Sequence, residues 1–391
     1  MPRPHVAIVG AGIGGLAAAV SLQKAGCTVE IHERAAELRP VGAGLTVQPN
    51  AVLALRHLGV GDRVERAGRS LRLGGLHLSD GTSLGQLPEA DARALLAEVG
   101  APVVGIHRAT LHEILLDAAG RACLHLGRSA TGWAVDDHGA TLHFDDGSTV
   151  RAAAVVGADG VHSACRRQLL DDGEPVYSGY FCWRGIAPGP GALPDDWGGE
   201  IWGDRARFGG CAIDGGRLYW FAVAEAPPGG RDPAGGAKVE ILELFHGFSA
   251  EVLDVIRSTP EAAIFRTDIH DRPPVTTWGR GRLTLLGDAA HAMTPNLGQG
   301  ACQAIEDALV LGTSLAGESD VPAALRRYEA LRQPRANAVV TAARRFGEMS
   351  HWRHPAATFV RDSLLRLMPT AVVRRQLAEA WSLPYAGFEG P

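Results

Sequence analysis

Short apolar runs and helical spacings alternate in the first part of the chain. Val6–Val9 is apolar at every position and ends at glycines, which is typical of a buried parallel strand. Leu16–Ala25 follows with helical spacing, and Gly26 is a residue type that commonly ends helices. Thr28–His32 then predicts a second strand. The pattern indicates a strand–helix–strand unit of about 30 residues.

The pattern changes in the middle of the chain. Between about Tyr177 and Val223, short aromatic and β-branched runs separated by Gly, Pro and Asp predict several antiparallel strands. Leu283–Leu286 then predicts a return to a buried strand. Helical spacing marks further segments: Asn50–Leu58, Lys238–Phe245, Ala250–Ser258, Gln299–Leu315, Arg326–Gly347 and the tail Pro355–Trp381.

This order of elements predicts an α/β protein. We expect a Rossmann-type nucleotide-binding domain with an inserted, mainly antiparallel β-sheet domain for the substrate, followed by C-terminal helices. The predicted boundaries are 1–70, 106–170 and 271–335 for the discontinuous nucleotide-binding domain, 71–105 and 171–270 for the sheet domain, and 336–391 for the C-terminal helical segment.

Composition narrows the class of protein. The 391 residues are 46% hydrophobic and 21% charged, which is ordinary for a soluble globular protein, and the net charge of -5 gives no reason to expect a nucleic acid partner. The six cysteines form no CxxC pair, which is typical of reduced thiols in the cytoplasm. The apolar run 6–20 is too short and rich in glycine to span a bilayer. We expect a cytoplasmic monomer or homodimer without stable membrane insertion.

A glycine motif follows the first predicted strand. Gly10, Gly12 and Gly15 stand in the GxGxxG register, with Gly14 between the last two. These glycines permit a tight turn, a close approach of the backbone to a pyrophosphate, and packing of the helix on the sheet. Glu33 lies about 20 residues further on, where an acid can bind ribose hydroxyls. The motif predicts a dinucleotide site but leaves NAD and FAD open.

Two later segments repeat the strand-to-glycine pattern. AAAVVGADGVHSAC (152–165) places Asp159 and Gly160 after an apolar strand, and LTLLGDAAHAMTPNLGQG (283–300) places Asp288 after another. Asp also suits turns, so either residue alone has a purely structural interpretation. Both follow buried strands, where ligands bind in α/β sheets, and this favours the functional interpretation.

Taken together, the three segments resemble the flavoprotein hydroxylases of the para-hydroxybenzoate hydroxylase superfamily. That family has an N-terminal GxGxxG, a central "DG" and a later "GD" motif, all present here in order. The segments VGAGLTVQPNAVLALRHLGV (41–60), GIHRATLHEIL (105–115) and YSGYFCWRG (177–185) are similar to the branch with urate, salicylate and 6-hydroxynicotinate hydroxylases. The resemblance covers most of the chain and is poorly specific for a substrate.

The resemblance implies FAD as the cofactor. Glu33 and Arg34 would bind the adenosine end, Arg108 the pyrophosphate region and Asp288 the ribityl chain, while Asp159 would connect flavin binding to nicotinamide access. The whole set expected to bind the cofactor is Gly10, Gly12, Gly14, Gly15, Glu33, Arg34, Thr46, Arg108, Ala130, Asp159, Gly160, Asp288, Pro295, Gly298, Gln299, Gly300 and Ala301. Thr46 and Ala130 are expected to contribute backbone contacts. We assign no catalytic role to His291 and expect no metal site.

The implied reaction is aromatic hydroxylation by O2 through a C4a-hydroperoxyflavin, with NADH or NADPH as a transient electron donor. A second GxGxxG motif is absent, which fits transient docking of the nicotinamide. The substrate should lie between the flavin and the antiparallel sheet. The candidate lining residues are Cys182, Trp183, Arg184, Arg207, Phe208, Tyr219 and Phe221. Each of them has an alternative interpretation as a core or solvated residue.

Other functions on the same fold stay open. Relatives of the superfamily include epoxidases and other flavin oxidoreductases, and a flavin-binding sensor without turnover is a further alternative. Halogenation is disfavoured because no WxWxIP-type segment occurs. The sequence leaves undetermined the substrate, the position of oxygenation and the choice between NADH and NADPH.

Overall fold

A mostly parallel sheet forms one half of the computed structural model, which describes residues 3–39, 42–85, 87–233 and 235–385. Its central strand β1 (His5–Val9) pairs in parallel with strands on both sides. Only the edge strand β17 pairs antiparallel. The sheet order is β17 (Gly279–Arg280), β18 (Leu283–Leu285), β11 (Ala154–Gly157), β1, β2 (Thr28–Glu33) and β7 (Leu124–Leu126). Strands from three separate stretches of the chain therefore build one domain.

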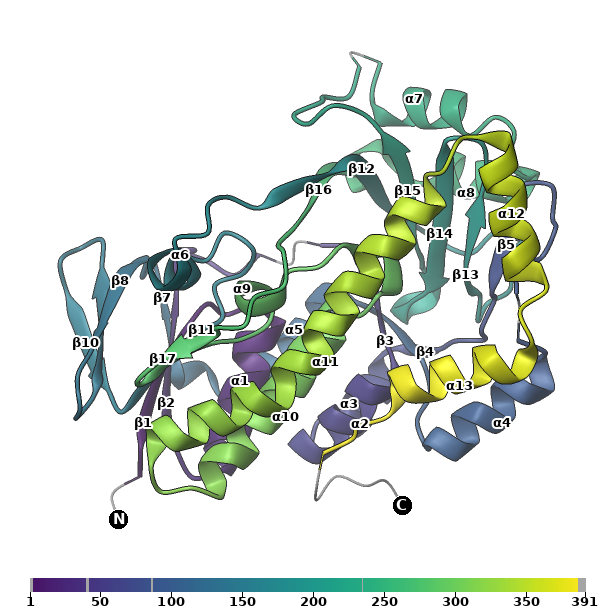
Figure 1. Ribbon diagram of the computed structural model, residues 1–391. Helices are drawn as coiled ribbons and strands as arrows, with labels where there is room; N and C mark the ends of the chain where they lie inside the picture. The colour runs from purple at the N-terminus through teal and green to yellow at the C-terminus, as the bar shows by residue number, and fades with distance from the viewer. Residues whose placement is uncertain (1–2, 40–41, 86, 234, 386–391) are drawn as a thin grey trace.

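A second large sheet stands beside the first, as Figure 1 shows. Its strands pair antiparallel except for β5, which runs parallel to β13. The order is β16 (Phe265–Asp271), β12 (Val176–Ala187), β15 (Leu218–Glu225), β14 (Ala206–Ala212), β13 (Gly198–Trp202) and β5 (Leu76–Leu78). The antiparallel strands expected between Tyr177 and Val223 are confirmed.

The described residues also form two small sheets of three strands each. The hydrophobic pattern of the sequence predicted neither of them. One has the order β3 (Gly44–Val47), β6 (Val104–His107) and β4 (Arg69–Ser70). The other has the order β10 (Thr149–Ala152), β9 (Ala140–Phe144) and β8 (Ala130–Val135). The strand β3 packs against β14 and β15, so it connects the two halves of the molecule.

Small residues allow the helices of the first domain to pack closely. Helix α1 (Ile13–Lys24) lies against α10 (Gly300–Ala316), where a Cβ on Gly312 would collide with Ser21. The other helices are α2 (Pro49–Leu58), α3 (Gly61–Ala67), α4 (Glu89–Val99), α5 (Arg108–Ala119), α6 (Ala164–Leu170), α7 (Ala237–Leu244), α8 (Ala250–Ser258), α9 (Asp288–His291), α11 (Val321–Ser350), α12 (Pro355–Arg366) and α13 (Thr370–Trp381).

The C-terminal helices differ from the expected boundaries. Helix α11 begins at Val321 rather than Arg326, and it crosses in front of both domains in Figure 1. The tail forms two helices because Pro369 cannot continue α12 and fixes the backbone where α13 begins. Within the described ranges, no helix is both long and apolar enough to cross a bilayer.

Candidate active site

The glycine turn after β1 leaves one side of the backbone open. A Cβ at Gly10 would lie 2.5 Å from the Ala158 carbonyl oxygen, and one at Gly15 would clash with the Gly10 carbonyl oxygen. A Cβ at Gly12, by contrast, would meet nothing within 4 Å. Gly12 is the N-cap of α1, so the open space lies where unpaired N–H groups and the positive end of the helix dipole attract an anion.

Glu33 lies beside this turn. Its carboxylate accepts hydrogen bonds from the Ala11 and Ala35 backbone N–H groups, each at 2.9 Å. Arg34 is exposed next to it, and Ala130 is close in the chain to Arg128, whose N–H donates to the Glu33 carbonyl. The acid expected to bind ribose is therefore adjacent to the glycine loop, as the strand–helix–strand unit requires.

Arg108 begins α5. We use the word groove for the region bordered by the glycine turn, Glu33, Arg108 and the loop before α10. Its side chain is exposed, and Gly42, with φ of +133°, lets the neighbouring loop pass closely over it. A Cβ at Gly42 would lie 3.2 Å from the Arg108 Cδ. The same face of α5 carries His112 one turn further on, and its Nε2 is 2.7 Å from the Ala11 carbonyl of the glycine loop.

The two aspartates of the later motifs have different environments. The Asp159 carboxylate accepts hydrogen bonds from the Ser163 hydroxyl at 2.5 Å and from the Ala164 N–H at 2.8 Å, so it caps α6. Asp288 is exposed at the start of α9 and forms no hydrogen bond with the described residues. Its carboxylate is 4.0 Å from the position of a Cβ on Gly300. The paired strands β11 and β18 bring both motifs to one edge of the sheet.

The loop before α10 brings the second glycine pair to the groove. After the short turn Pro295–Leu297, Gly298 adopts a φ of +62°, which favours glycine. A Cβ there would lie 3.2 Å from the Thr46 hydroxyl of β3. Gln299 is the N-cap of α10, and the helix begins at Gly300, followed by Ala301. This backbone presents the N–H groups of a helix start to the groove.

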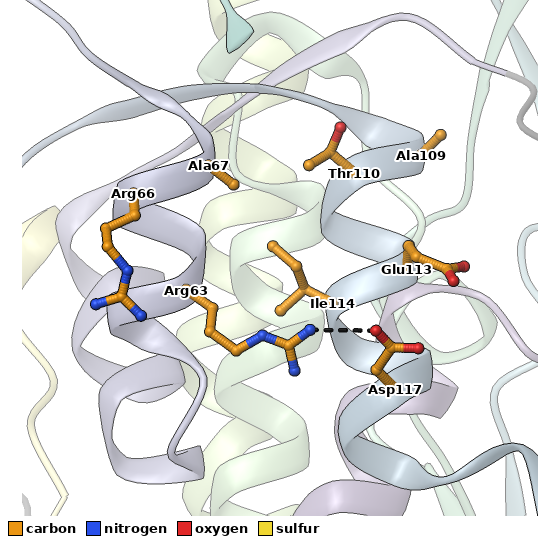
Figure 2. A pocket seen from close by; sticks show the side chains of 8 residues that line it. All are labelled: Arg63, Arg66, Ala67, Ala109, Thr110, Glu113, Ile114 and Asp117. Atoms are coloured by element: carbon orange, nitrogen blue, oxygen red, sulfur yellow. Dashed lines mark hydrogen bonds and ion pairs between the residues drawn. The ribbon is translucent and has the colours of Figure 1, made fainter.

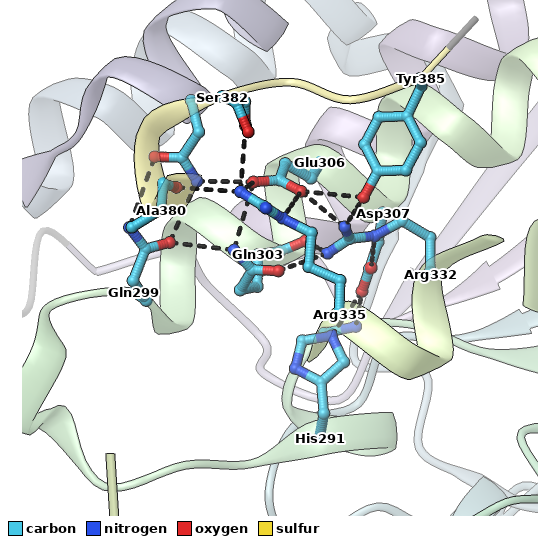
Figure 3. A network of polar contacts seen from close by, with 12 residues as sticks. His291, Gln299, Gln303, Glu306, Asp307, Arg332, Arg335, Ala380, Ser382 and Tyr385 are labelled. Carbon is cyan, nitrogen blue, oxygen red and sulfur yellow. Dashed lines mark hydrogen bonds and ion pairs between the residues drawn. The ribbon is translucent and has the colours of Figure 1, made fainter. Parts of the chain in front are cut away.

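A buried network of hydrogen bonds and ion pairs holds this loop in place through the side chain of Gln299 (Figure 3). Gln299 Nε2 donates to Gln48 Oε1 at 2.6 Å, and Gln299 Oε1 accepts from Asn50 at 3.0 Å and from Gln303 at 2.9 Å. Asn50 Nδ2 also donates to Glu306 at 2.6 Å. The network continues through ion pairs of Arg332 and Arg335 to Tyr385 and the backbone at Ala380 and Ser382.

His291 belongs to the same buried network. Its Nε2 is 2.6 Å from Asp307 Oδ2, and its ring packs on Trp278. Both partners of the ion pair are fully buried. The side chain is therefore enclosed by packing.

Strand alternation divides the sheet residues between two faces. Arg184, Arg207, Tyr219 and Phe221 lie on the face toward the first domain, which we call the inner face. Trp183 and Phe208 lie on the outer face, packed with α7 and α8 residues in one core cluster. Trp183 donates its indole N–H to Asp232, and Phe208 stacks on Trp220. The placement of Trp183 and Phe208 in the pocket was wrong, because neighbours in a strand point to opposite faces.

Arg207 connects the second sheet to the loop that precedes Gly298 and α10. Its Nη2 donates to Asn296 Oδ1 at 2.8 Å, and its Nη1 is 3.2 Å from Glu200 Oε1. Only 3% of Arg207 is exposed. Asn296 also donates to the Tyr180 hydroxyl at 2.8 Å. The sequence interpretation missed Glu200 and Asn296; the latter stands inside the TPNLGQG motif, where its neighbours had been singled out.

Arg184, Tyr219 and Phe221 remain partly exposed on the inner face. Arg184 donates to the Thr267 hydroxyl, and Phe221 lies directly over Gly209, where a Cβ would strike its ring. Burial raises the pKa of Tyr219, against the lowering effect of Arg184, so its hydroxyl is neutral and available as a donor at pH 7.

Hollows lie at two places among the described residues, one beside the inner face of the second sheet and one elsewhere. One of about 280 Å³ is bordered by Tyr180, Thr294, Arg344 and His351, next to Asn296. The other, about 760 Å³ and wide open, lies between α3 and α5 (Figure 2). There Arg63 pairs with Asp117 at 3.2 Å. Its α5 residues occupy a different face of the helix from Arg108 and His112, so this larger hollow is separate from the groove.

The family comparison agrees with this geometry. The model of the "FAD binding domain" family matches residues 3–180 and 254–343. The aurachin C monooxygenase/isomerase of Stigmatella aurantiaca is 44% identical over 363 residues, 93% of this chain and 94% of that protein. Klebsiella pneumoniae HpxO complexed with FAD and uric acid superposes with a TM-score of 0.89 at 32% identity, covering 97% of this chain and 96% of that one.

The chain belongs to the FAD-dependent aromatic hydroxylases. The chain also has an epoxidase relative, the chloroplastic zeaxanthin epoxidase of Spinacia oleracea, 36% identical over 360 residues, 87% of this chain and 53% of that protein. The residues of the groove fit FAD: open space at Gly12, a carboxylate at the end of β2, a free Asp288 and a helix start at Gly300.

Proposed function

We propose that the hydroxylase is a single-component monooxygenase that inserts one oxygen atom of O2 into an aromatic or heteroaromatic small molecule at the expense of NADH or NADPH. The observation that carries this proposal is the hydrogen bond between Arg207 of the second sheet and Asn296 of the loop before Gly298. It brings the inner face of that sheet against the place where the flavin ring would lie. A substrate between them would be close to both.

Each end of the groove has a separate binding role. The glycine turn at Gly12 and the start of α1 would hold the pyrophosphate, with Arg108 beside it, and Glu33 would bind the ribose. Asp288 would bind the ribityl hydroxyls, and the start of α10 would stabilise negative charge on the flavin. FAD, once bound and reduced by the nicotinamide, supplies an electrophilic oxygen derived from O2.

The protein's own contribution to the reaction is positioning and exclusion of water. Phe221 offers an aromatic surface held against Gly209, and Tyr219 offers a neutral hydroxyl beside it. Apolar surface around the ring would limit the loss of the reactive oxygen to water. The polar network behind Gln299 would hold the helix start rigid during turnover.

The test is whether a ligand stimulates flavin turnover and receives oxygen. The purified protein should be yellow, and oxidation of NADH or NADPH should accelerate with one member of a panel containing aurachin C, urate, phenols and hydroxy-heterocycles. With ¹⁸O2, the product should gain one labelled oxygen atom. A protein that binds no FAD would refute the proposal. Bound FAD without ligand-stimulated oxidation across the panel would favour a flavin-binding sensor.

Epoxidation is the second candidate, and the zeaxanthin epoxidase relative favours it. The two reactions differ in the group that receives oxygen, since hydroxylation labels a ring carbon and epoxidation labels a former double bond. Zeaxanthin therefore belongs in the panel, and mass spectrometry of the labelled product assigns the reaction.

A further inference from the structure

We propose that Arg184 is the residue that recognises the substrate, and that it selects an aromatic ring bearing an anionic oxygen, either a carboxylate or an ionised hydroxyl. This inference rests on the proposed function and narrows its substrate class. The sequence names both Arg184 and Arg207 as candidate lining residues of the substrate site, and the structure distinguishes them.

The two inner-face arginines differ in how their charge is balanced. Arg207 is 3.2 Å from the Glu200 carboxylate and donates to Asn296. Within the described part of the chain, Arg184 has no ion pair with a carboxylate, and its side chain contacts two neutral hydroxyls, those of Thr267 and Tyr219. A guanidinium has five N–H donors, so Arg184 keeps donors for a ligand.

Strand order keeps the inner-face acid Glu200 away from Arg184. Arg184 is on β12 and Glu200 is on β13, with β15 and β14 between them. Three strand spacings amount to about 14 Å. Glu200 therefore balances Arg207 and leaves Arg184 without contact to a carboxylate.

Two charged residues near Arg184 on the neighbouring strand β16, Arg266 and Asp268, face the other way. Arg266 lies 3.5 Å from the centre of the Phe181 ring on the outer face. Asp268 pairs across from Phe181 on that same face and accepts from the Gly229 N–H at 2.6 Å. The inner face at Arg184 thus keeps a positive charge that none of these groups neutralises.

The two arginines also differ in the solvent exposure of their side chains. Arg184 is partly exposed, together with Tyr219 and Phe221, whereas Arg207 is 3% exposed. A ring lying on Phe221 would place its substituents within the row that holds Arg184, because Arg184 and Phe221 are paired residues of adjacent strands. Bidentate pairing of a guanidinium with an anionic oxygen would then fix the ring's orientation.

The direct test compares ligands of matched shape and different charge. Benzoate with benzamide tests the carboxylate, and 4-nitrophenolate with nitrobenzene tests the ionised hydroxyl. Binding to the FAD-loaded protein is measured from the change in flavin absorbance. The wild type should prefer the anion of at least one pair by about tenfold or more, as expected of a charged hydrogen bond in a partly buried site.

Variants assign the preference to one side chain. Arg184→Gln should bind both members of the pair with similar affinity, and Arg184→Lys should retain much of the preference because it keeps the charge. Arg266→Gln is the matched control, since Arg266 is a largely buried arginine on the opposite face of the same sheet. It should keep the wild-type ratio. The affinity ratio of anionic to neutral ligand is determined within each variant. A general loss of protein stability affects both affinities equally and leaves this ratio unchanged.

Two outcomes would overturn the inference. One is a wild-type protein without anion preference in either pair, and the other is an Arg184→Gln variant that keeps the preference. Bound FAD and ligand-stimulated NADH oxidation in the same preparations would show that the proposed function stands while the role of Arg184 fails. A protein without FAD would instead refute the proposed function.

Discussion

The indole nitrogen of Trp381 donates a hydrogen bond to Gln48 Oε1 at 3.0 Å. Gln48 in turn donates to the Leu297 carbonyl at 2.7 Å and accepts from Gln299. The end of the last helix is therefore two hydrogen bonds away from the glycine loop of the flavin site. Trp381 is 4% exposed, so water does not readily replace this contact.

Trp381→Phe should weaken FAD binding about two- to tenfold with little change in fold. Phenylalanine keeps most of the packing but removes the N–H, which frees Gln48 and loosens the loop at Gln299; the loss of one net hydrogen bond is worth about 1 kcal/mol. FAD titration by flavin fluorescence measures the effect. The matched control is Trp278→Phe, because the buried Trp278 N–H has no hydrogen-bond partner among the described residues. Equal effects of both variants on FAD affinity would contradict the role of the Trp381 contact.

Gly12→Val should abolish FAD retention in a folded protein. The added Cβ would enter the open space where the pyrophosphate is expected and would meet no protein atom within 4 Å. Flavin content and circular dichroism together report the result. Gly15→Val is the contrasting variant, and it should destabilise the fold because its Cβ would clash with the Gly10 carbonyl. A folded Gly12→Val protein with normal flavin content would disprove the assignment of the groove.

Arg332→Met should lower the free energy of unfolding by about 3–5 kcal/mol, because it removes the guanidinium that pairs with two buried carboxylates. Arg332 Nε lies 2.6 Å from Asp307, and Arg332 Nη1 lies 2.5 Å from Glu306, with all three side chains fully buried. Urea unfolding measures the change. Arg63→Met, which breaks the exposed pair with Asp117, should cost about 1 kcal/mol or less. Similar losses in the two variants would argue against a buried network that stabilises the fold.

Stability should fall as pH decreases from about 6.5 to about 4. Burial, followed by the nearby Arg207, lowers the pKa of His351 from 6.5 to about 4. In this window the unfolded chain binds a proton that the native protein excludes, so the native state loses up to about 1.4 kcal/mol per pH unit. Above pH 6.5 both states are neutral and the effect vanishes.

His351→Gln should reduce this pH dependence. Unfolding measured at pH 4.5 and 7.5 gives the difference for each protein, and the variant should show the smaller one. The remaining slope is expected from His32, whose pKa burial also lowers to about 4. An unchanged difference would show that His351 is not excluded from protonation in the native protein.

Local patterns in the sequence were sufficient for the first strand–helix–strand unit and for the positions of both motif aspartates. Gly10, Gly12, Gly15 and Glu33 belong to one short stretch of chain. Their spacing alone therefore predicts that the glycines surround the start of α1 and that Glu33, at the end of β2, lies beside it. The same holds for the alternation of Tyr219, Trp220 and Phe221, because neighbouring strand residues point to opposite faces. Applied to Arg207, that rule would also have placed Phe208 on the outer face.

Contacts between distant segments were decided only by the tertiary structure. Glu200 neutralises Arg207 from the adjacent strand, and Asn296 reaches the same guanidinium from the loop of another domain. Trp381 reaches Gln48 from 333 residues away in the chain. The hydrophobic pattern of the sequence does not predict such pairs, because nothing in the local sequence of either partner indicates the other. Charge balance on the inner face, and with it the distinction between Arg184 and Arg207, depends on which strands become neighbours when the sheet assembles.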